Sequence, residues 1–200
     1  MKFYDENNIL IDIEDKEVIE QRYAKQFTEP DDVVLELGAR YGSVSCALNA
    51  KLNNKLNQVS VEPDSRVWEA LESNRALNDC NFHIVKGFIS NRKLGLTNLH
   101  VCSNGYGATS VEQQDSTILS YTLKEVEEQY NLKFNVLFAD CEGFLEVFLD
   151  ENNYILDQLR MIIYECDYPE KCNYDRIKHM LLEKGYHCLI DEFHSVYIKK

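Results

Sequence analysis

The chain has 200 residues, of which 44% are hydrophobic, and only 8 Gly and 3 Pro, so it can form one domain with a buried core and is not rich in linkers. Its 34 acidic and 21 basic residues give a formal charge of −13, which repels phosphate backbones and anionic lipid; we predict no nucleic-acid partner. No apolar stretch reaches the roughly 18 residues of a membrane span, and 7 scattered Cys without a CxxC pair indicate a reducing, cytoplasmic compartment.

Hydrophobic periodicity in the first half of the chain predicts alternating helices and strands. Helices show apolar side chains on one face, whereas the strands are short β-branched runs bounded by polar residues and Gly. The predicted helices are 14–27, 43–53 and 65–78, and the predicted strands are 33–37, 58–61 and 82–85.

The pattern changes in an inserted segment at 87–120. A short hairpin is predicted from 87 to about 115, with its return strand at 99–102. Small residues at 103–110 predict a loop, and we expect this loop, with Tyr106 in it, to cover a pocket.

The second half of the chain returns to alternation. Helices are predicted at 122–130, 142–150 and 175–184, and strands at 134–139, 161–164, 186–190 and 195–199. Alternating strands and helices predict a mostly parallel sheet with helices on both faces. The last two strands have no room for a crossover helix between them, so they form an antiparallel hairpin at one edge. We predict a seven-stranded Rossmann-like α/β fold in one domain, 1–200, with an N-terminal helical extension at 1–30.

The end of the predicted strand 33–37 and the turn after it read Glu36-Leu37-Gly38-Ala39-Arg40-Tyr41-Gly42. A glycine directly after a buried strand allows a tight turn and the close approach of a ligand, and a second glycine opens the next helix. A dinucleotide site would need G-x-G-x-x-G to hold a pyrophosphate. The spacing found here therefore favours a ligand without phosphates.

The second strand ends at Val61-Glu62-Pro63-Asp64. An acidic side chain about 20 residues past the glycine turn commonly accepts hydrogen bonds from ribose hydroxyls. Glu62 could accept from both hydroxyls at once. The alternative is an ordinary turn with a surface glutamate.

These motifs resemble those of S-adenosylmethionine (SAM)-dependent methyltransferases, and in particular the FkbM-like family. The resemblance covers about 32–165 and includes E-L-G-A-R-Y-G, V-E-P-D, the stretch at 74–88, the S-N-G-Y-G-A-T-S loop and A-D-C-E-G at 139–143. Glu36 and Arg40 stand where that family usually has Asp and Asn, and Ala108-Thr109-Ser110 stands where it has a serine pair.

The resemblance implies the class I methyltransferase fold, with SAM as the methyl donor. Together with the turn chemistry, it predicts a cofactor site of Glu36, Gly38, Ala39, Arg40, Tyr41, Gly42, Glu62, Pro63, Gly87, Phe88 and Asp140. FkbM-like enzymes mostly methylate hydroxyls, so it also implies an O-methyltransferase that acts on a sugar or glycan, associated with glycosyltransferases in glycan biosynthesis.

Methyl transfer to a hydroxyl needs a group that accepts the hydroxyl proton. Asp140, Glu142 and Glu165 are carboxylates at adjacent strand ends, and we predict that they are the catalytic residues. Asp140 is the favoured base and Glu165 supports it. Alternatively, Glu142 only caps its helix and Asp140 contacts the cofactor.

Hard oxygen ligands also suit a divalent ion. A Mg²⁺ or Mn²⁺ ion that bridges Asp140 and Glu165, or Asp167, is an alternative that we do not favour, and no metal ligand is predicted. His187 and His194 flank edge strands, and we interpret both as structural.

Two other functions stay open at this point. The chain could methylate a different small molecule, a lipid or a protein. It could also be a catalytically silent SAM-fold module in a glycan-building assembly. Neither the acceptor nor the oligomeric state follows from the residues.

Overall fold

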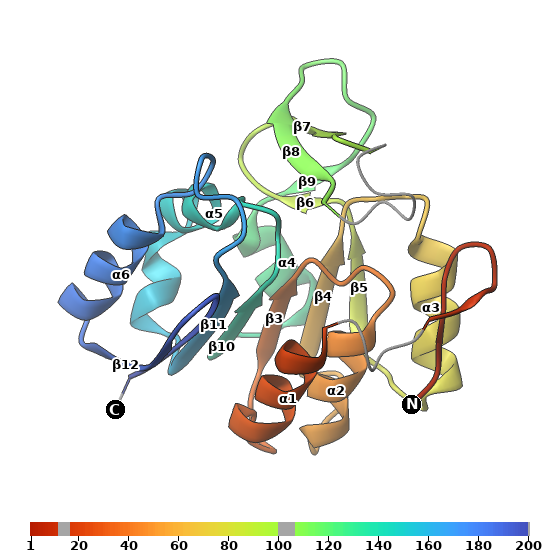
Figure 1. The fold of residues 1–200 in the computed structure, drawn as a ribbon, viewed down its shortest axis with the longest axis horizontal. Helices are drawn as coiled ribbons and strands as arrows, with labels where there is room; N and C mark the ends of the chain where they lie inside the picture. Colours follow the sequence, from red (N-terminus) through yellow and green to blue (C-terminus); the bar gives the residue numbers. More distant parts are fainter. Residues whose placement is uncertain (12–16, 100–106, 200) are drawn as a thin grey trace.

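The computed structural model describes residues 1–11, 17–99 and 107–199 (Figure 1). Its centre is a seven-stranded sheet in the order β12-β13-β11-β10-β3-β4-β5. The five strands from β11 to β5 are parallel to one another, and β13 is antiparallel to both β11 and β12. The strands are β3 (Val34–Leu37), β4 (Gln58–Glu62), β5 (His83–Lys86), β10 (Val136–Ala139), β11 (Met161–Glu165), β12 (Tyr186–Asp191) and β13 (His194–Lys199).

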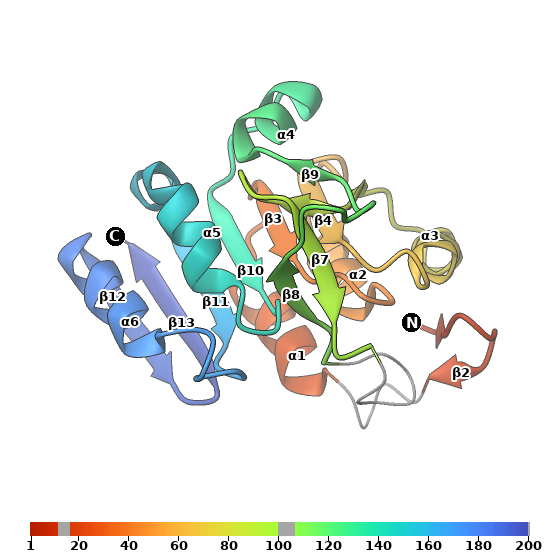
Figure 2. The same ribbon diagram turned by 90° about the horizontal axis from the view of Figure 1, so that it is seen from above.

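Helices cover both faces of this sheet (Figure 2). One face carries α1 (Val18–Phe27), α2 (Ser43–Lys51) and α3 (Trp68–Leu77). The other carries α4 (Leu123–Tyr130), α5 (Leu145–Glu151), a 3₁₀ turn η1 (Asn153–Asp157) and α6 (Tyr174–Glu183).

The two helical layers pack on alternate residues of the same strands. Val34 and Phe138 belong to the apolar cluster with α1 and α2, whereas Leu35 and Leu137 belong to the cluster with α4, α5 and α6. Successive side chains of a strand point to opposite faces, so a strand buried on both sides has an unbroken apolar run. The predicted parallel sheet with an antiparallel C-terminal hairpin is confirmed.

The inserted segment differs from the prediction. It forms β6 (Phe88–Ile89), β7 (Leu94–Thr97), β8 (Thr109–Glu112) and β9 (Ser120–Tyr121), and β7 pairs with β8. The strand that returns along β7 is β8, and Asn98, just after β7, adopts a left-handed conformation with φ of 61°. Residues 100–102 of the predicted return strand and 103–106 of the predicted loop, Tyr106 included, lie outside the described residues, whereas Thr109 and Ser110 of that loop belong to β8.

The N-terminal segment adds a hairpin that the sequence did not predict. β1 (Phe3–Tyr4) pairs with β2 (Leu10–Ile11), and Phe3 is fully buried beside Leu71 and Phe82. The hairpin is fixed to α3, since Asn74 accepts from the Tyr4 amide and donates to the Tyr4 carbonyl. None of the helices formed by the described residues has the length and apolar character required to cross a membrane.

Glu36 introduces a carboxyl group into the buried strand β3. It is 1% exposed, and one of its oxygens accepts a hydrogen bond from Ser45 at 2.5 Å. Burial raises its pKa to about 7, although hydrogen bonds from Ser45, Ser60 and Gln58 oppose the rise. The folded chain therefore holds this proton to higher pH than the unfolded chain.

This proton predicts a pH-dependent gain in stability for Glu36→Gln. Between pH 4.5 and about 7 the wild type loses stability, because Glu36 ionises in the unfolded chain while burial keeps it protonated in the fold, whereas a neutral Gln causes no such loss. Thermal unfolding should show a higher melting temperature for the variant, relative to wild type, at pH 8 than at pH 5, by about 2 to 4 °C for each kcal/mol. The exposed Glu128→Gln should show no such change. An equal difference at both pH values would contradict the burial argument.

Candidate functional site

The carboxyl ends of β3, β4 and β10 open into a cleft below the inserted strands. Apolar lining comes from both the sheet and the insertion, with Leu37 and Phe88 as examples. Five acidic residues and one basic residue also line it: Glu17, Glu62, Asp64, Asp140, Glu142 and Arg40. The described lining is therefore strongly acidic.

Gly38 allows the floor of this cleft to form. Its φ is +91°, and an added Cβ would lie 1.6 Å from the carbonyl oxygen of Asp140. The Gly38 and Ala39 amides donate to the Val61 carbonyl at 3.1 and 3.0 Å, and the Asp140 amide donates to the Leu37 carbonyl at 3.0 Å. The chain thus turns tightly between three strand ends, and only a glycine fits there.

Glu62 is held in one orientation at the wall of the cleft. Its two carboxylate oxygens accept from the amides of Arg40 and Asp64, each at 2.7 Å. Burial raises the pKa of Glu62 to about 7, while these two amides and the Arg40 charge lower it. Each carboxylate oxygen has a further lone pair, so the group could accept two neighbouring hydroxyls.

The Arg40 side chain neutralises part of the negative charge on the side of the cleft formed by Glu62 and Asp64. Its guanidinium lies 3.0 Å from Asp64, whose other partner is Arg66 at 2.6 Å, and 4.8 Å from the centre of the Tyr41 ring. Hydrogen bonds and the charges of the two arginines lower the pKa of Asp64 although burial opposes this. The positive charge of Arg40 is thus engaged with Asp64.

The opposite wall, called the acidic wall below, is formed by Asp140 and Glu142, whose carboxyl groups interact with those of Glu165 and Asp167 behind them. Burial raises the pKa of Asp140 well above its usual value, and a hydrogen bond with Glu165 adds to the rise. Burial and a hydrogen bond with Asp167 raise the pKa of Glu142 to about 8, and Glu142 accepts from the Gly107 amide at 3.0 Å. Two neighbouring carboxyls that cannot both ionise share a proton. This wall therefore holds protons near neutral pH.

Glu17 joins this wall from the start of α1. It lines the cleft, and Ser43 donates a hydrogen bond to its carboxylate. Burial and the nearby carboxyls of Glu20, Glu36 and Glu165 raise its pKa to about 8.

The structure brings only some of the predicted site residues together. Those that line the cleft are Gly38, Arg40, Glu62, Pro63, Phe88, Asp140 and Glu142. The predicted residues that lie outside the lining are Glu36, Ala39, Tyr41, Gly42, Gly87 and Glu165. Glu165 stands behind Asp140 and contacts it, whereas the other five have scaffold contacts.

These scaffold contacts have local causes. Glu36 points to α2, since side chains alternate along β3, and Ala39 packs in the cluster with Phe3. Tyr41 donates to Glu6, and Gly42 begins α2 where a Cβ would meet Leu71 at 2.8 Å. An added Cβ at Gly87 would lie 2.4 Å from the Leu119 carbonyl oxygen, so this glycine admits the inserted segment.

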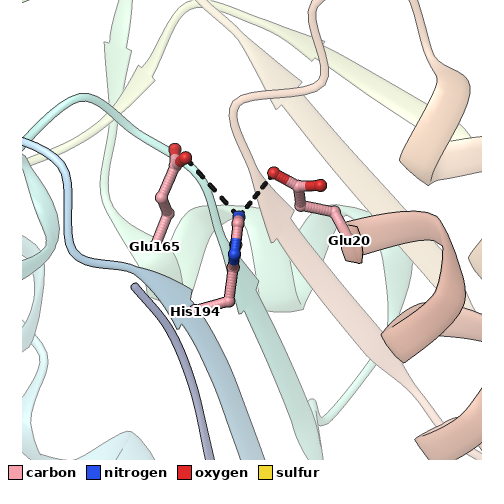
Figure 3. A group of neighbouring side chains, drawn as sticks. All are labelled: Glu20, Glu165 and His194. Atoms are coloured by element: carbon pink, nitrogen blue, oxygen red, sulfur yellow. Dashed lines mark hydrogen bonds and ion pairs between the residues drawn. The ribbon is translucent and has the colours of Figure 1, made fainter. Parts of the chain in front are cut away.

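Sequence reasoning missed part of the acidic wall. His194, interpreted above as a structural residue beside an edge strand, lies against Glu165 and Glu20 (Figure 3). A signal for this existed, because antiparallel pairing of β11 with β13 makes Glu165 and His194 register partners. Glu17 and Glu20 gave no local signal.

Two groups of side chains bear on the alternative of a bound divalent ion. Asp140, Glu165 and Asp167 bring ligand oxygens within 4.8 Å of one another, and so do the ligand atoms of Glu20, Glu165 and His194. In the second group, His194 accounts for the positions of both carboxylates, since its ring nitrogen contacts Glu20 at 2.6 Å and Glu165 at 3.5 Å. The divalent ion therefore stays the alternative that was not favoured from the sequence.

Three solved structures that are similar to this one are described as methyltransferases or methylases. The precorrin-6y C5,15-methyltransferase of Geobacter metallireducens GS-15 matches with a TM-score of 0.55 and 13% identity over 93% of this chain and 88% of that one. An rRNA methylase of Streptococcus thermophilus gives 0.54 and 6% over 90% and 94%. A ribosomal protein L11 methylase of Lactobacillus delbrueckii subsp. bulgaricus gives 0.51 and 12% over 91% and 78%.

These likenesses establish the fold. The chain has the α/β fold of these methyltransferases, with a mostly parallel seven-stranded sheet and an antiparallel C-terminal hairpin, which confirms the fold part of the sequence-based expectation. No protein-family model matches the chain, and no curated protein matches its sequence. The FkbM-like assignment stays a prediction.

The exclusion of nucleic acid is wrong. One of the similar structures is an rRNA methylase, so this fold is used on RNA. The argument failed because a formal charge of −13 averages over the whole surface, whereas an acceptor meets the local surface around one cleft.

The floor of the cleft predicts a difference between two glycine substitutions. Gly38 and Gly185 both have positive φ, but a Cβ at Gly185 meets nothing within 4 Å. Gly185→Ala should cost about 1 kcal/mol from backbone strain alone. Gly38→Ala should cost several times as much in thermal unfolding, because the Asp140 backbone must also move. Equal losses would contradict the close approach.

Proposed function

We propose that the chain is a SAM-dependent methyltransferase that binds SAM in the cleft at the carboxyl ends of β3, β4 and β10. The fold supports this proposal, because ligands of open α/β sheets bind at the carboxyl ends of the strands. The observation that carries it is the Glu62 carboxylate, fixed by two backbone amides beside the Gly38 turn. That carboxylate would accept the two ribose hydroxyls of the adenosine.

The apolar lining supports the rest of the cofactor assignment. Pro63 and Phe88 line the same cleft as Glu62 and would pack against the adenine. The Gly38 turn leaves the floor open for the methionine end. The Gly38 and Ala39 amides are already bonded to Val61, so this end would be held mainly by side chains and charge.

The charge of the cleft favours a cationic ligand. Five acidic side chains line it, and the guanidinium of its basic residue, Arg40, is paired with Asp64. SAM carries a positive sulfonium that becomes a neutral thioether after transfer. Opposite charges attract most strongly where water is excluded. The acidic wall would thus hold the reactive centre of SAM.

Methyl transfer breaks the bond between sulfur and the methyl carbon and forms a bond between that carbon and the acceptor. The acceptor then loses a proton, which a carboxylate in the cleft takes. Asp140 and Glu142 both line the cleft and have raised pKa values, as suits groups that take up a proton near neutral pH. We favour Asp140 as the base, with Glu165 behind it.

The acceptor is a nucleophile that releases a proton on methylation. Sequence analysis favoured a sugar hydroxyl and kept other acceptors open. The similar structures act, by their descriptions, on a corrin precursor, rRNA and a ribosomal protein. They support the wider alternative, an acceptor other than a sugar. The raised pKa values in the cleft favour an enzyme over a silent module.

Loss of the Glu62 carboxylate should weaken SAM binding. Hydrogen bonds to a charged group contribute about 1.5 to 3 kcal/mol, so Glu62→Ala should raise the Kd by about 10- to 100-fold in isothermal titration. Glu69→Ala, on the exposed side of α3, should bind SAM like the wild type. The proposal fails if wild type does not bind SAM, or if both variants bind it equally well.

Loss of the Asp140 carboxylate should affect turnover and not SAM binding. With tritium-labelled SAM and any acceptor that the wild type methylates, Asp140→Asn should lower the rate by about 100-fold or more. Its Kd for SAM should change little, since Asn resembles the protonated carboxyl. The wild-type rate should rise with pH, because the raised pKa keeps Asp140 protonated at lower pH. Asp115→Asn, which is exposed, is the control; full activity of Asp140→Asn would exclude this base.

A further inference from the structure

His194 lies between Glu165 and Glu20 (Figure 3). His194 Nε2 lies 2.6 Å from Glu20 Oε1 and 3.5 Å from Glu165 Oε1. The three residues come from the start of β13, from α1 and from the end of β11. Their side chains are 11%, 9% and 18% exposed, so water screens them little.

The groups that face His194 decide its charge. Glu20 approaches from α1 and Glu165 from β11, and the Tyr23 ring of α1 stands edge-on with its centre 6.4 Å away. Burial opposes a charge on the imidazole, but the two carboxylates outweigh it and raise the pKa of His194 to about 9. His194 is therefore an imidazolium at neutral pH.

Glu165 connects this imidazolium to the cleft. Burial would raise the pKa of Glu165, yet its hydrogen bonds with His194 and Asp140 lower it. Asp140, by contrast, faces Glu165, Glu17 and Glu142, which are all acidic, and its pKa rises. The two members of the Asp140–Glu165 pair thus differ because a cation stands next to only one of them.

We propose that His194, held in place by Glu20, is a positioning residue: its positive charge keeps Glu165 ionised, so that the proton shared by the pair stays on Asp140. This inference rests on the proposed function for its role in catalysis. When the pair has lost this proton at higher pH, the Asp140 carboxylate takes the proton that the acceptor releases, and Glu165 stays ionised. The pair gains one proton in total, and His194 keeps its charge beside Glu20.

The charge of His194 can be measured without SAM or an acceptor. An NMR titration of the histidine rings should show one ring that titrates near pH 9, and His194→Gln should remove that signal. His187→Gln, on exposed β12, is the matched control and should leave it. Titration of His194 at or below pH 6.5, its unperturbed value, would overturn the inference.

Substitutions of the two carboxylates that contact His194 test its charge while the histidine itself is kept. Glu20→Gln and Glu165→Gln each remove one neighbouring negative charge and should lower the pKa of His194 by about one unit or more. These variants also serve if His194→Gln does not fold. An unchanged His194 titration in both would overturn the inference.

The role in catalysis is tested by the pH dependence of methyl transfer. Without the imidazolium, the fully ionised pair is less stable, so the alkaline rise in rate should move to higher pH in His194→Gln. His194→Lys, which restores a cation, should bring it back toward wild type. A purely structural histidine would lower the rate at every pH without moving the profile. If SAM does not bind at all, the proposed function fails while the NMR titration still tests the charge of His194.

Discussion

The close approach of Gly38 to the carbonyl of Asp140 sets the geometry of the whole site. It allows β3 and β10 to end side by side with no side chain between them. As a result, the Asp140 carboxyl lies on one side of the turn and Glu62 on the other, and both line the same cleft. The backbone of Arg40, in a left-handed conformation with φ of 44°, then reaches Glu62. One backbone contact thus brings the side of the cleft with Glu62 and the acidic wall with Asp140 together.

Burial of the carboxyl groups of the acidic wall lowers the stability of the fold without a ligand, and their negative charge suits a cationic ligand. Glu17 and Glu142 have pKa values of about 8, so near neutral pH they are largely protonated. A positive sulfonium in the cleft would favour their ionised forms and release protons. Binding and proton release would then be linked, since a ligand can shift a titration only through its different interaction with the two forms. The same carboxyls that destabilise the empty cleft would therefore contribute to the affinity for SAM.

The sequence predicted well what depends on short-range pattern. The apolar runs of β3 and β10, the Gly38 turn and the acidic end of β4 all follow from neighbouring residues, and the fold and the position of Glu62 agree with them. It predicted less well which side of a turn each residue faces. Glu36 and Tyr41 lie within the turn motif but point to the scaffold, because alternation along β3 and the hydrogen bond to Glu6 turn them away from the cleft.

The remaining part of the site depends on contacts that no local pattern contains. Glu20 and His194 are 174 positions apart, and they meet only because α1 packs on the sheet beside the C-terminal hairpin. Each residue alone looks unremarkable: a glutamate on a polar helix and a histidine at a strand end. Their contact has a consequence for folding as well as for chemistry. His194 can contact both Glu20 and Glu165 only after α1 and β13 have packed on the sheet. In the proposed arrangement, the protonation of Asp140 therefore depends on the complete tertiary structure.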